Sequence, residues 1–165
     1  MFRRIADVDR AWQAEAESTL KVLAQLTDAS LNQRVTPDGR SLGFLAWHLA
    51  TSIPEMMNRT GLTVEGADHG PAPATAEEIR GAYERASRSL LEQIRARWTD
   101  ASLEQEVDLY GERWQNGFTI FALIAHQTHH RGQVTVLMRQ AGLRVPGVYG
   151  PAREEWATMG MAAME

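Results

Sequence analysis

The sequence predicts an all-α protein, specifically a four-helix bundle with irregular long loops and a C-terminal tail that packs back on the bundle. Four long stretches repeat apolar residues at the helical period, and no stretch shows a convincing sheet pattern. Turn signals rich in Gly and Pro separate these stretches. The 165 residues fit a single domain, 1–165, which is long enough to bury a sizeable core.

The first helix is expected over residues 5–26. Its apolar side consists of Ile5, Val8, Trp12, Ala16, Thr19, Leu23 and Leu26. The segment that follows contains Thr36-Pro37-Asp38-Gly39. This string is typical of a turn, because Pro presets φ and Gly accepts backbone angles that other residues avoid. It therefore marks the connection to the second helix.

The second helix is expected from Leu42 to about Thr60, with Ser41 as its N-cap and Gly61 as its stop. The inward side carries Leu42, Leu45, His48, Leu49, Ser52, Ile53 and Met56. Pro54 lies inside the helix and removes one backbone donor, so a kink is expected about one turn beyond His48.

The third helix follows a Gly/Pro/Ala-rich loop over residues 61–74. His69 lies in this loop, where we expect it to be exposed to solvent, and it is rejected as a metal ligand. Thr75 and Glu78 form a capping-box pattern that opens the helix, which runs to about Trp98. Its apolar stripe consists of Ile79, Tyr83, Ala86, Leu90, Ile94 and Trp98.

The fourth helix is expected over residues 120–141, with Asn116 or Thr119 as its cap and Gly142 as its end. Residues 107–114, just before it, could form a short extended hairpin. The side of the helix away from His126 is also apolar, which indicates burial on two sides or contact with another subunit. The tail over residues 145–156 is expected to wrap back irregularly, with a short helix from Pro151.

Three of the five histidines lie within five residues of this last helix. His126 and His130 are four residues apart and share one face, and Gln133 falls between them. Two such imidazoles can bind one metal ion, but a third ligand must come from elsewhere, and the chain has no Cys. His48 faces inward from the second helix. One such histidine is usually a satisfied core residue, whereas one divalent ion would satisfy all three.

The composition excludes several classes of function. A net charge of −4 and a pI of about 5.7 argue against nucleic acid as the main partner. No apolar run is long enough to span a membrane, and the arginines near the start precede no apolar region, so no signal peptide is expected. Without Cys there is no disulfide framework, and the cytoplasm is the expected location.

The string His126-x-x-x-His130-Arg131-Gly132-Gln133 sharpens the metal hypothesis. Together with Leu45-Ala46-Trp47-His48 before it and Tyr149-Gly150-Pro151 after it, it resembles the DinB-like superfamily over residues 40–160. The resemblance implies a four-helix bundle, often a homodimer, that holds one divalent metal ion, Zn²⁺ or Ni²⁺ above all. The metal ligands it implies are His48, His126 and His130.

Characterised relatives use the metal to activate a low-molecular-weight thiol such as bacillithiol, mycothiol or glutathione. The leading hypothesis is therefore a metal-dependent transferase that joins an external thiol, as co-substrate, to a small electrophile. Gln133 could bind a metal-bound water or orient an imidazole, although a buried structural amide is an equal alternative. Arg131 is expected to be structural, and His129 lies to the side of the site. Tyr149 and Trp156 are expected to pin the tail.

Two other functions remain open from the sequence. A metal-dependent hydrolase of a small molecule would need a carboxylate as general base, and Glu15, Glu154 or Glu155 could reach the site. A non-catalytic metal-binding module, induced by stress such as DNA damage as the family name suggests, is the third hypothesis. A metal sealed from solvent would favour that third hypothesis.

Overall fold

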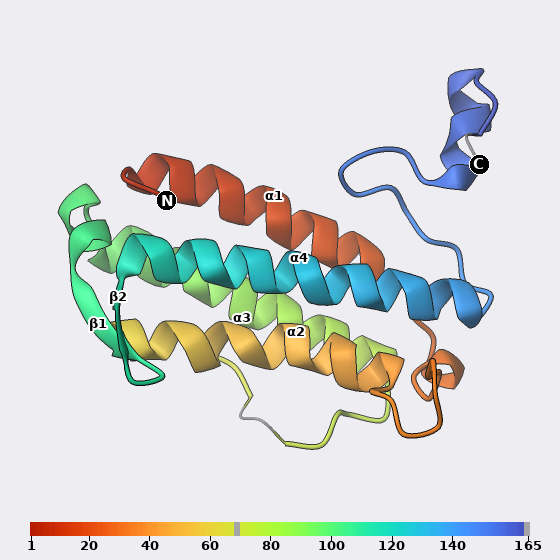
Figure 1. Cartoon of the computed structure of the whole chain (residues 1–165), viewed down its shortest axis with the longest axis horizontal. Coiled ribbons are helices and arrows are strands. Elements are labelled where there is room, and N and C mark those ends of the chain that lie inside the picture. Colours follow the sequence, from red (N-terminus) through yellow and green to blue (C-terminus); the bar gives the residue numbers. More distant parts are fainter. Residues whose placement is uncertain (68–69, 164–165) are drawn as a thin grey trace.

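Four long helices account for most of the part of the chain that the computed structural model describes, residues 1–67 and 70–163. They are α1 (Ile5–Leu23), α2 (Leu42–Met57), α3 (Ala76–Arg97) and α4 (Asn116–Gln140), and they run alongside one another (Figure 1). The shorter 3₁₀ elements are η1 (Asp28–Ser30), η2 (Asn58–Thr60), η3 (Asp100–Glu104) and η4 (Arg153–Met159). The prediction of a mostly helical chain is confirmed. The prediction for His69 falls outside the described residues.

The core lies between the four helices. α2 packs against α3 and α4, and α1 packs against the same two helices from the other side. The largest fully buried side chains are Trp12, Tyr83, Leu23, Leu42, Leu49, Ile53, Met57, Ile79, Leu90, Ile94, Leu103 and Leu109. Among the described helices, none has the length and the apolar character needed to cross a membrane.

Two of the three N-cap residues predicted from the sequence form the expected hydrogen bonds. The Ser41 hydroxyl accepts from the Phe44 amide at 3.1 Å, and the Thr75 hydroxyl accepts from the Glu78 amide at 3.3 Å. The third expectation is wrong. α4 begins at Asn116 itself, and its N-cap residue Gln115 makes no side-chain cap bond. The Asn116 amide group instead donates to the Ser102 carbonyl at 3.0 Å, so it anchors η3 rather than the helix end.

Two of the predicted helix ends depend on left-handed glycines. Gly61, with φ of 82°, follows η2, and Gly142, with φ of 72°, follows α4. Pro54 lies in the last turn of α2, and the helix continues through it to Met57. The kink expected at Pro54 stays a prediction.

A small antiparallel sheet interrupts the helical pattern, so the all-α class is too narrow. β1 (Glu106–Leu109) pairs with β2 (Glu112–Gln115) around a two-residue turn, which confirms the expected hairpin. Both turn residues have positive φ, 57° at Tyr110 and 84° at Gly111, as two-residue hairpins require. The Tyr110 hydroxyl donates to Glu55 at 2.7 Å, so a contact with α2 supports a conformation that Tyr rarely adopts.

The C-terminal tail packs back on the helices over only part of its length. The segment after α4 returns to α1, where Lys21 donates to the Gly147 carbonyl at 2.8 Å. η4 contains no buried residue and stands away from the helices in Figure 1. An Arg139–Glu154 ion pair links it to α4. Trp156, the large apolar residue of this element, is only half-buried, so the element gains little from burial of apolar surface.

Candidate metal centre

The three histidines that the sequence singles out meet between α2 and α4. His48 comes from α2, and His126 and His130 come from consecutive turns of α4. One ring nitrogen from each residue lies within 4.8 Å of the others. The Nε2 atoms of His48 and His126 are 3.1 Å apart. His130 is buried, whereas His48 and His126 are half-buried, so the cluster opens at the side of the helices instead of being sealed inside them.

Gln127, a residue that the sequence did not suggest, fixes the position of the two helices at this point. Its fully buried amide donates to the Leu49 carbonyl at 2.9 Å and to the Ser52 hydroxyl at 3.1 Å. Since Gln127 follows His126 and Leu49 follows His48, these bonds set the register of α4 against α2 beside the imidazoles. The sequence carried no signal for this role, because it depends on contacts between α2 and α4.

The donor set fits a divalent ion. Two nitrogens bound at 2.0–2.1 Å to one tetrahedral ion lie about 3.3 Å from each other, close to the 3.1 Å between His48 and His126. His126 Nδ1 is buried without a hydrogen-bond partner among the described residues, whereas His130 Nδ1 has one. Three neutral imidazoles would leave a further position on the ion for a substrate, as catalytic sites do.

The environment of His126 and His130 favours the neutral form of imidazole, which is the form that binds metals. Burial, with smaller contributions from His130 and His48, lowers the pKa of His126 to about 4. Burial also lowers the pKa of His130, although the hydrogen bond that His130 donates to Gln133 acts in the opposite direction. Both rings are therefore uncharged at neutral pH, and few protons compete with a metal ion for them.

Gln133 contacts one of the three histidines directly. Its Oε1 accepts from His130 Nδ1 at 2.8 Å, which leaves Nε2 of that ring free for a ligand bond. The Gln133 Nε2 group donates to His129 Nε2 at 3.2 Å. His129 is exposed and lies outside the three-histidine group, as the sequence suggested.

Arg131 directly follows His130 in the chain, but its side chain contacts α1 and the C-terminal tail. It is 2% exposed and pairs with Glu15, itself 4% exposed, at 2.6 Å. The same guanidinium donates to Thr19 at 2.9 Å and to the Tyr149 hydroxyl at 2.6 Å. Tyr149 also donates to Glu15 at 2.7 Å. Arg131 therefore joins α4 to α1 and to the tail, and Tyr149 pins the tail as expected.

The carboxylates considered for a hydrolase have other partners. Glu15 pairs with Arg131, Glu154 pairs with Arg139, and Glu155 accepts from the Gly147 and Ala152 amides. In the part of the chain that the structure describes, the group of possible metal ligands contains the three histidines and no carboxylate. The expectation that one of these glutamates reaches the site is therefore not supported.

Comparison with known proteins gives consistent matches. The model of the family described as "DinB family" matches residues 1–163. "Uncharacterized protein YrdA" of Bacillus subtilis (strain 168) is 43% identical over 164 residues, which is 99% of this chain and 98% of that protein.

Solved structures also match. A DinB-like protein from Bacillus cereus ATCC 10987 superposes with a TM-score of 0.88 at 43% identity and covers 90% of this chain and all 100% of that one. A second DinB-like protein, YjoA of Bacillus subtilis, gives a TM-score of 0.68 at 15% identity over 86% of this chain and 97% of that one. At that identity the likeness shows the fold alone.

Proposed function

The chain belongs to the DinB family, and from this premise we propose that it is a metal-dependent enzyme that transfers a low-molecular-weight thiol to small electrophiles. We further propose that α1–α4 form a four-helix bundle whose side carries the metal site, which their mutual packing supports. The observation that carries the proposal is the convergence of His48, His126 and His130 at a half-exposed position between α2 and α4.

Each residue of the site has a distinct part in the proposal. The three histidines would hold one divalent ion, with Zn²⁺ or Ni²⁺ as the first candidates. Bound there, the ion would lower the pKa of a coordinated thiol, so that thiolate is present at neutral pH. Gln133 holds the His130 ring in one orientation through Nδ1. Gln127 keeps the two helices in register, so that the histidines do not need to be gathered when metal binds.

The absence of Cys from the chain supports thiol transfer to a limited extent, since no protein thiolate competes with the co-substrate for the ion. The two other functions have weaker support. Hydrolysis lacks a neighbouring carboxylate among the described residues, and a purely structural metal would be expected at a sealed site rather than a half-exposed one.

The proposal extends to the assembly and location of the protein. The proposal includes a homodimer in which the side chain of Phe121 on α4, 47% exposed in the single chain, is covered by the partner copy. A partner copy is thus proposed in addition to a thiol and a small electrophile, with neither nucleic acid nor membrane as a partner. The cytoplasm stays a prediction from the sequence.

An assay of thiol consumption tests the proposed activity. Purified protein, either stripped of metal or loaded with Zn²⁺ or Ni²⁺, is mixed with glutathione or bacillithiol and a generic electrophile such as 1-chloro-2,4-dinitrobenzene. We expect the loaded protein to accelerate loss of the thiol, and His48→Ala to remove the acceleration. Equal rates for the stripped and loaded protein would exclude metal-dependent thiol transfer.

A further inference from the structure

Arg40 lies in the loop that leads into α2, the helix that carries His48. It follows the turn that closes when the Gly39 amide donates to the Thr36 carbonyl at 3.0 Å. A Cβ on Gly39 would lie 2.9 Å from Thr36 Oγ1, so a larger residue there would displace that hydroxyl. Arg40 then directly precedes Ser41, the N-cap of α2. The turn and the cap together hold the Arg40 backbone on both sides.

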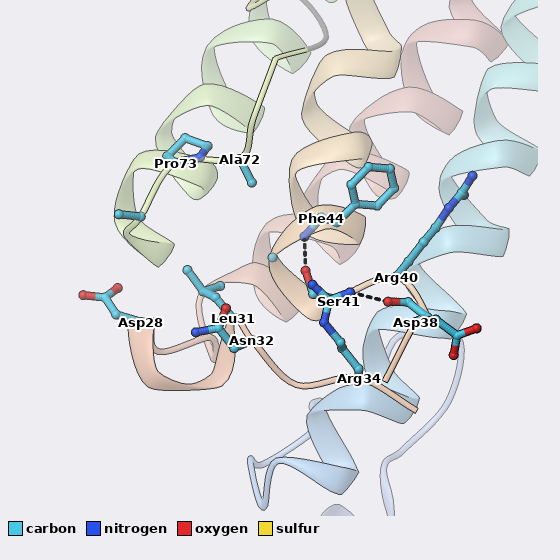
Figure 2. Close-up of a pocket in the computed structure, with 13 residues that line it drawn as sticks. Asp28, Leu31, Asn32, Arg34, Asp38, Arg40, Ser41, Phe44, Ala72 and Pro73 are labelled. Carbon is cyan, nitrogen blue, oxygen red and sulfur yellow. Dashed lines mark hydrogen bonds between the residues drawn. The ribbon is translucent and has the colours of Figure 1, made fainter. Parts of the chain in front are cut away.

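The two arginines of this loop point in different directions. The loop lines a cavity of about 610 Å³, whose lining residues are drawn in Figure 2. The Arg34 guanidinium donates to the Gly39 carbonyl. Arg40 instead runs past the Phe44 ring toward α4 (Figure 2). Its guanidinium carbon is 5.1 Å from the centre of that ring. No carboxylate within residues 1–67 and 70–163 forms an ion pair with Arg40.

Two sets of contacts join Arg40 to the histidines. Phe44, beneath its guanidinium, stacks on His48 with ring centres 6.1 Å apart. On the other side Arg40 lines a second cavity, of about 340 Å³, together with Gln133, which bonds to His130. The remaining lining residues are Val35, Gly39, Leu45, Val136 and Leu137. Arg40 is therefore the one charged residue among the described residues that line a mainly apolar cavity.

The electrostatics of this cavity favour an anion. The Arg40 guanidinium packs over the Phe44 ring, and that ring stacks on His48, so the positive charge lies next to the aromatic residue that borders the cluster. A divalent ion at the histidines would add to this positive field, and an anion nearby would relieve the repulsion.

The first amides of α2 do not provide an alternative anion site. Leu42 N donates to the Gln33 carbonyl at 2.9 Å, and Gly43 N donates to the Leu31 carbonyl at 2.8 Å. Phe44 N donates to the Ser41 hydroxyl. Because these donors are occupied, the Arg40 guanidinium is the group at this end of the helix that remains available to bind an anion.

We propose that Arg40 is a specificity-determining residue that binds a carboxylate on the thiol co-substrate while the apolar cavity beside Gln133 accommodates the body of that molecule. This inference rests on the proposed function, because it assumes that a thiol binds at the three histidines. It adds that the thiol is a small anion, and it assigns recognition of the negative charge to a residue outside the histidine cluster.

Binding of two thiols to the Co²⁺-loaded protein tests the inference. 3-Mercaptopropionate carries a carboxylate, and 3-mercaptopropan-1-ol is its uncharged counterpart. Thiolate-to-Co²⁺ charge-transfer absorption reports binding of each thiol without any need for turnover. The variants are Arg40→Gln, Arg40→Lys and, as a remote control for the loss of one positive charge, Arg88→Gln on the exposed side of α3. Each variant is first checked for full Co²⁺ loading.

We expect Arg40→Gln to weaken binding of 3-mercaptopropionate on the order of tenfold, as loss of a charge-assisted hydrogen bond does, and to leave 3-mercaptopropan-1-ol unchanged. The affinity of Arg40→Lys for 3-mercaptopropionate should lie between those of the parent protein and Arg40→Gln. Lysine keeps the positive charge but lacks the planar guanidinium that can bind both carboxylate oxygens. Arg88→Gln should match the parent protein. If Arg40→Gln weakened the binding of both thiols equally, or the binding of neither, the inference would be overturned while the proposed function stood. If neither thiol produced a charge-transfer band with the parent protein, the proposed thiol chemistry would fail and the inference with it.

Discussion

The Oε1 atom of Gln133 accepts a hydrogen bond from Nδ1 of His130 at 2.8 Å, one turn along the same helix. An imidazole held in this way has its tautomer and its ring direction set before any ion arrives. The amide that the sequence left between two interpretations thus contacts a candidate ligand, although it is itself exposed. Several predictions depend on this contact and on the packing around it.

Gln133→Ala should weaken metal binding about tenfold to a hundredfold, the usual effect of removing a partner that orients a ligand. The number of ions bound at saturation should not change. Competition with a chromophoric chelator measures the affinity. Gln140→Ala, a change to an exposed glutamine on the same helix, serves as the control. An unchanged affinity in Gln133→Ala would show that the contact does not orient the ligand.

Gln127→Ala should lower both the free energy of unfolding and the metal affinity. The truncation removes two hydrogen bonds from a side chain with no exposed surface and leaves a cavity, so a loss of about 2–4 kcal/mol is expected. Urea unfolding of the metal-free protein measures the first effect, and chelator competition measures the second. A stability loss without a change in affinity would argue against a role for this register in building the site.

Arg131→Met should destabilise the protein by about 3–5 kcal/mol, because Glu15 would remain buried without its cation. The double variant Glu15→Gln with Arg131→Met should recover much of the loss, since no unpaired charge is then buried. Thermal unfolding of the single and double variants provides the comparison. If the double variant were less stable than Arg131→Met, the burial of an unpaired charge would not be the cause.

The stability of the metal-free protein should fall as the pH is lowered from about 6.5 toward about 4. The pKa of His126 is about 4 in the folded chain, below the ordinary 6.5 of an unfolded histidine. Between these values the unfolded state binds the proton and the folded state does not, so acid favours unfolding. The stabilisation that the neutral His126 provides is fully present above pH 6.5. It is lost as the pH falls to about 4, and the stability changes no further through this residue below that pH. His126→Gln should make the dependence on pH in this window less steep, as urea midpoints at several pH values would show.

The sequence predicted most of the helices because their apolar periodicity and caps are local features. Ser41, Thr75, Gly61 and Gly142 each mark a boundary near the one observed, since a cap or a left-handed glycine acts on its own turn. The short helix expected from Pro151 is observed as η4, but its lack of buried residues could not be predicted, because nothing in its own residues reveals whether a groove is available to bury it.

The residues of the candidate site also divide into those that local sequence could predict and those that only the packed structure shows. The shared face of His126 and His130 follows from helical geometry. His48 was chosen from its inward position on the second helix, and the resemblance implied the same ligand. Gln127 and Arg40 could not be found in this way, because their significance depends on contacts between segments far apart in the chain. Arg131 was expected to be structural, but the identity of its partner, Glu15, 116 residues away, required the packed structure.

The most direct test of the account is the metal content per chain, measured by mass spectrometry after reconstitution. The parent protein should contain about one divalent ion per chain, as one three-histidine site requires. His48→Ala, His126→Ala and His130→Ala should each lose it, and His129→Ala, which changes a neighbouring exposed histidine, should retain it. An unchanged content in His48→Ala would contradict the ligand assignment. A parent protein without bound metal would leave three clustered histidines with no basis for the proposed chemistry.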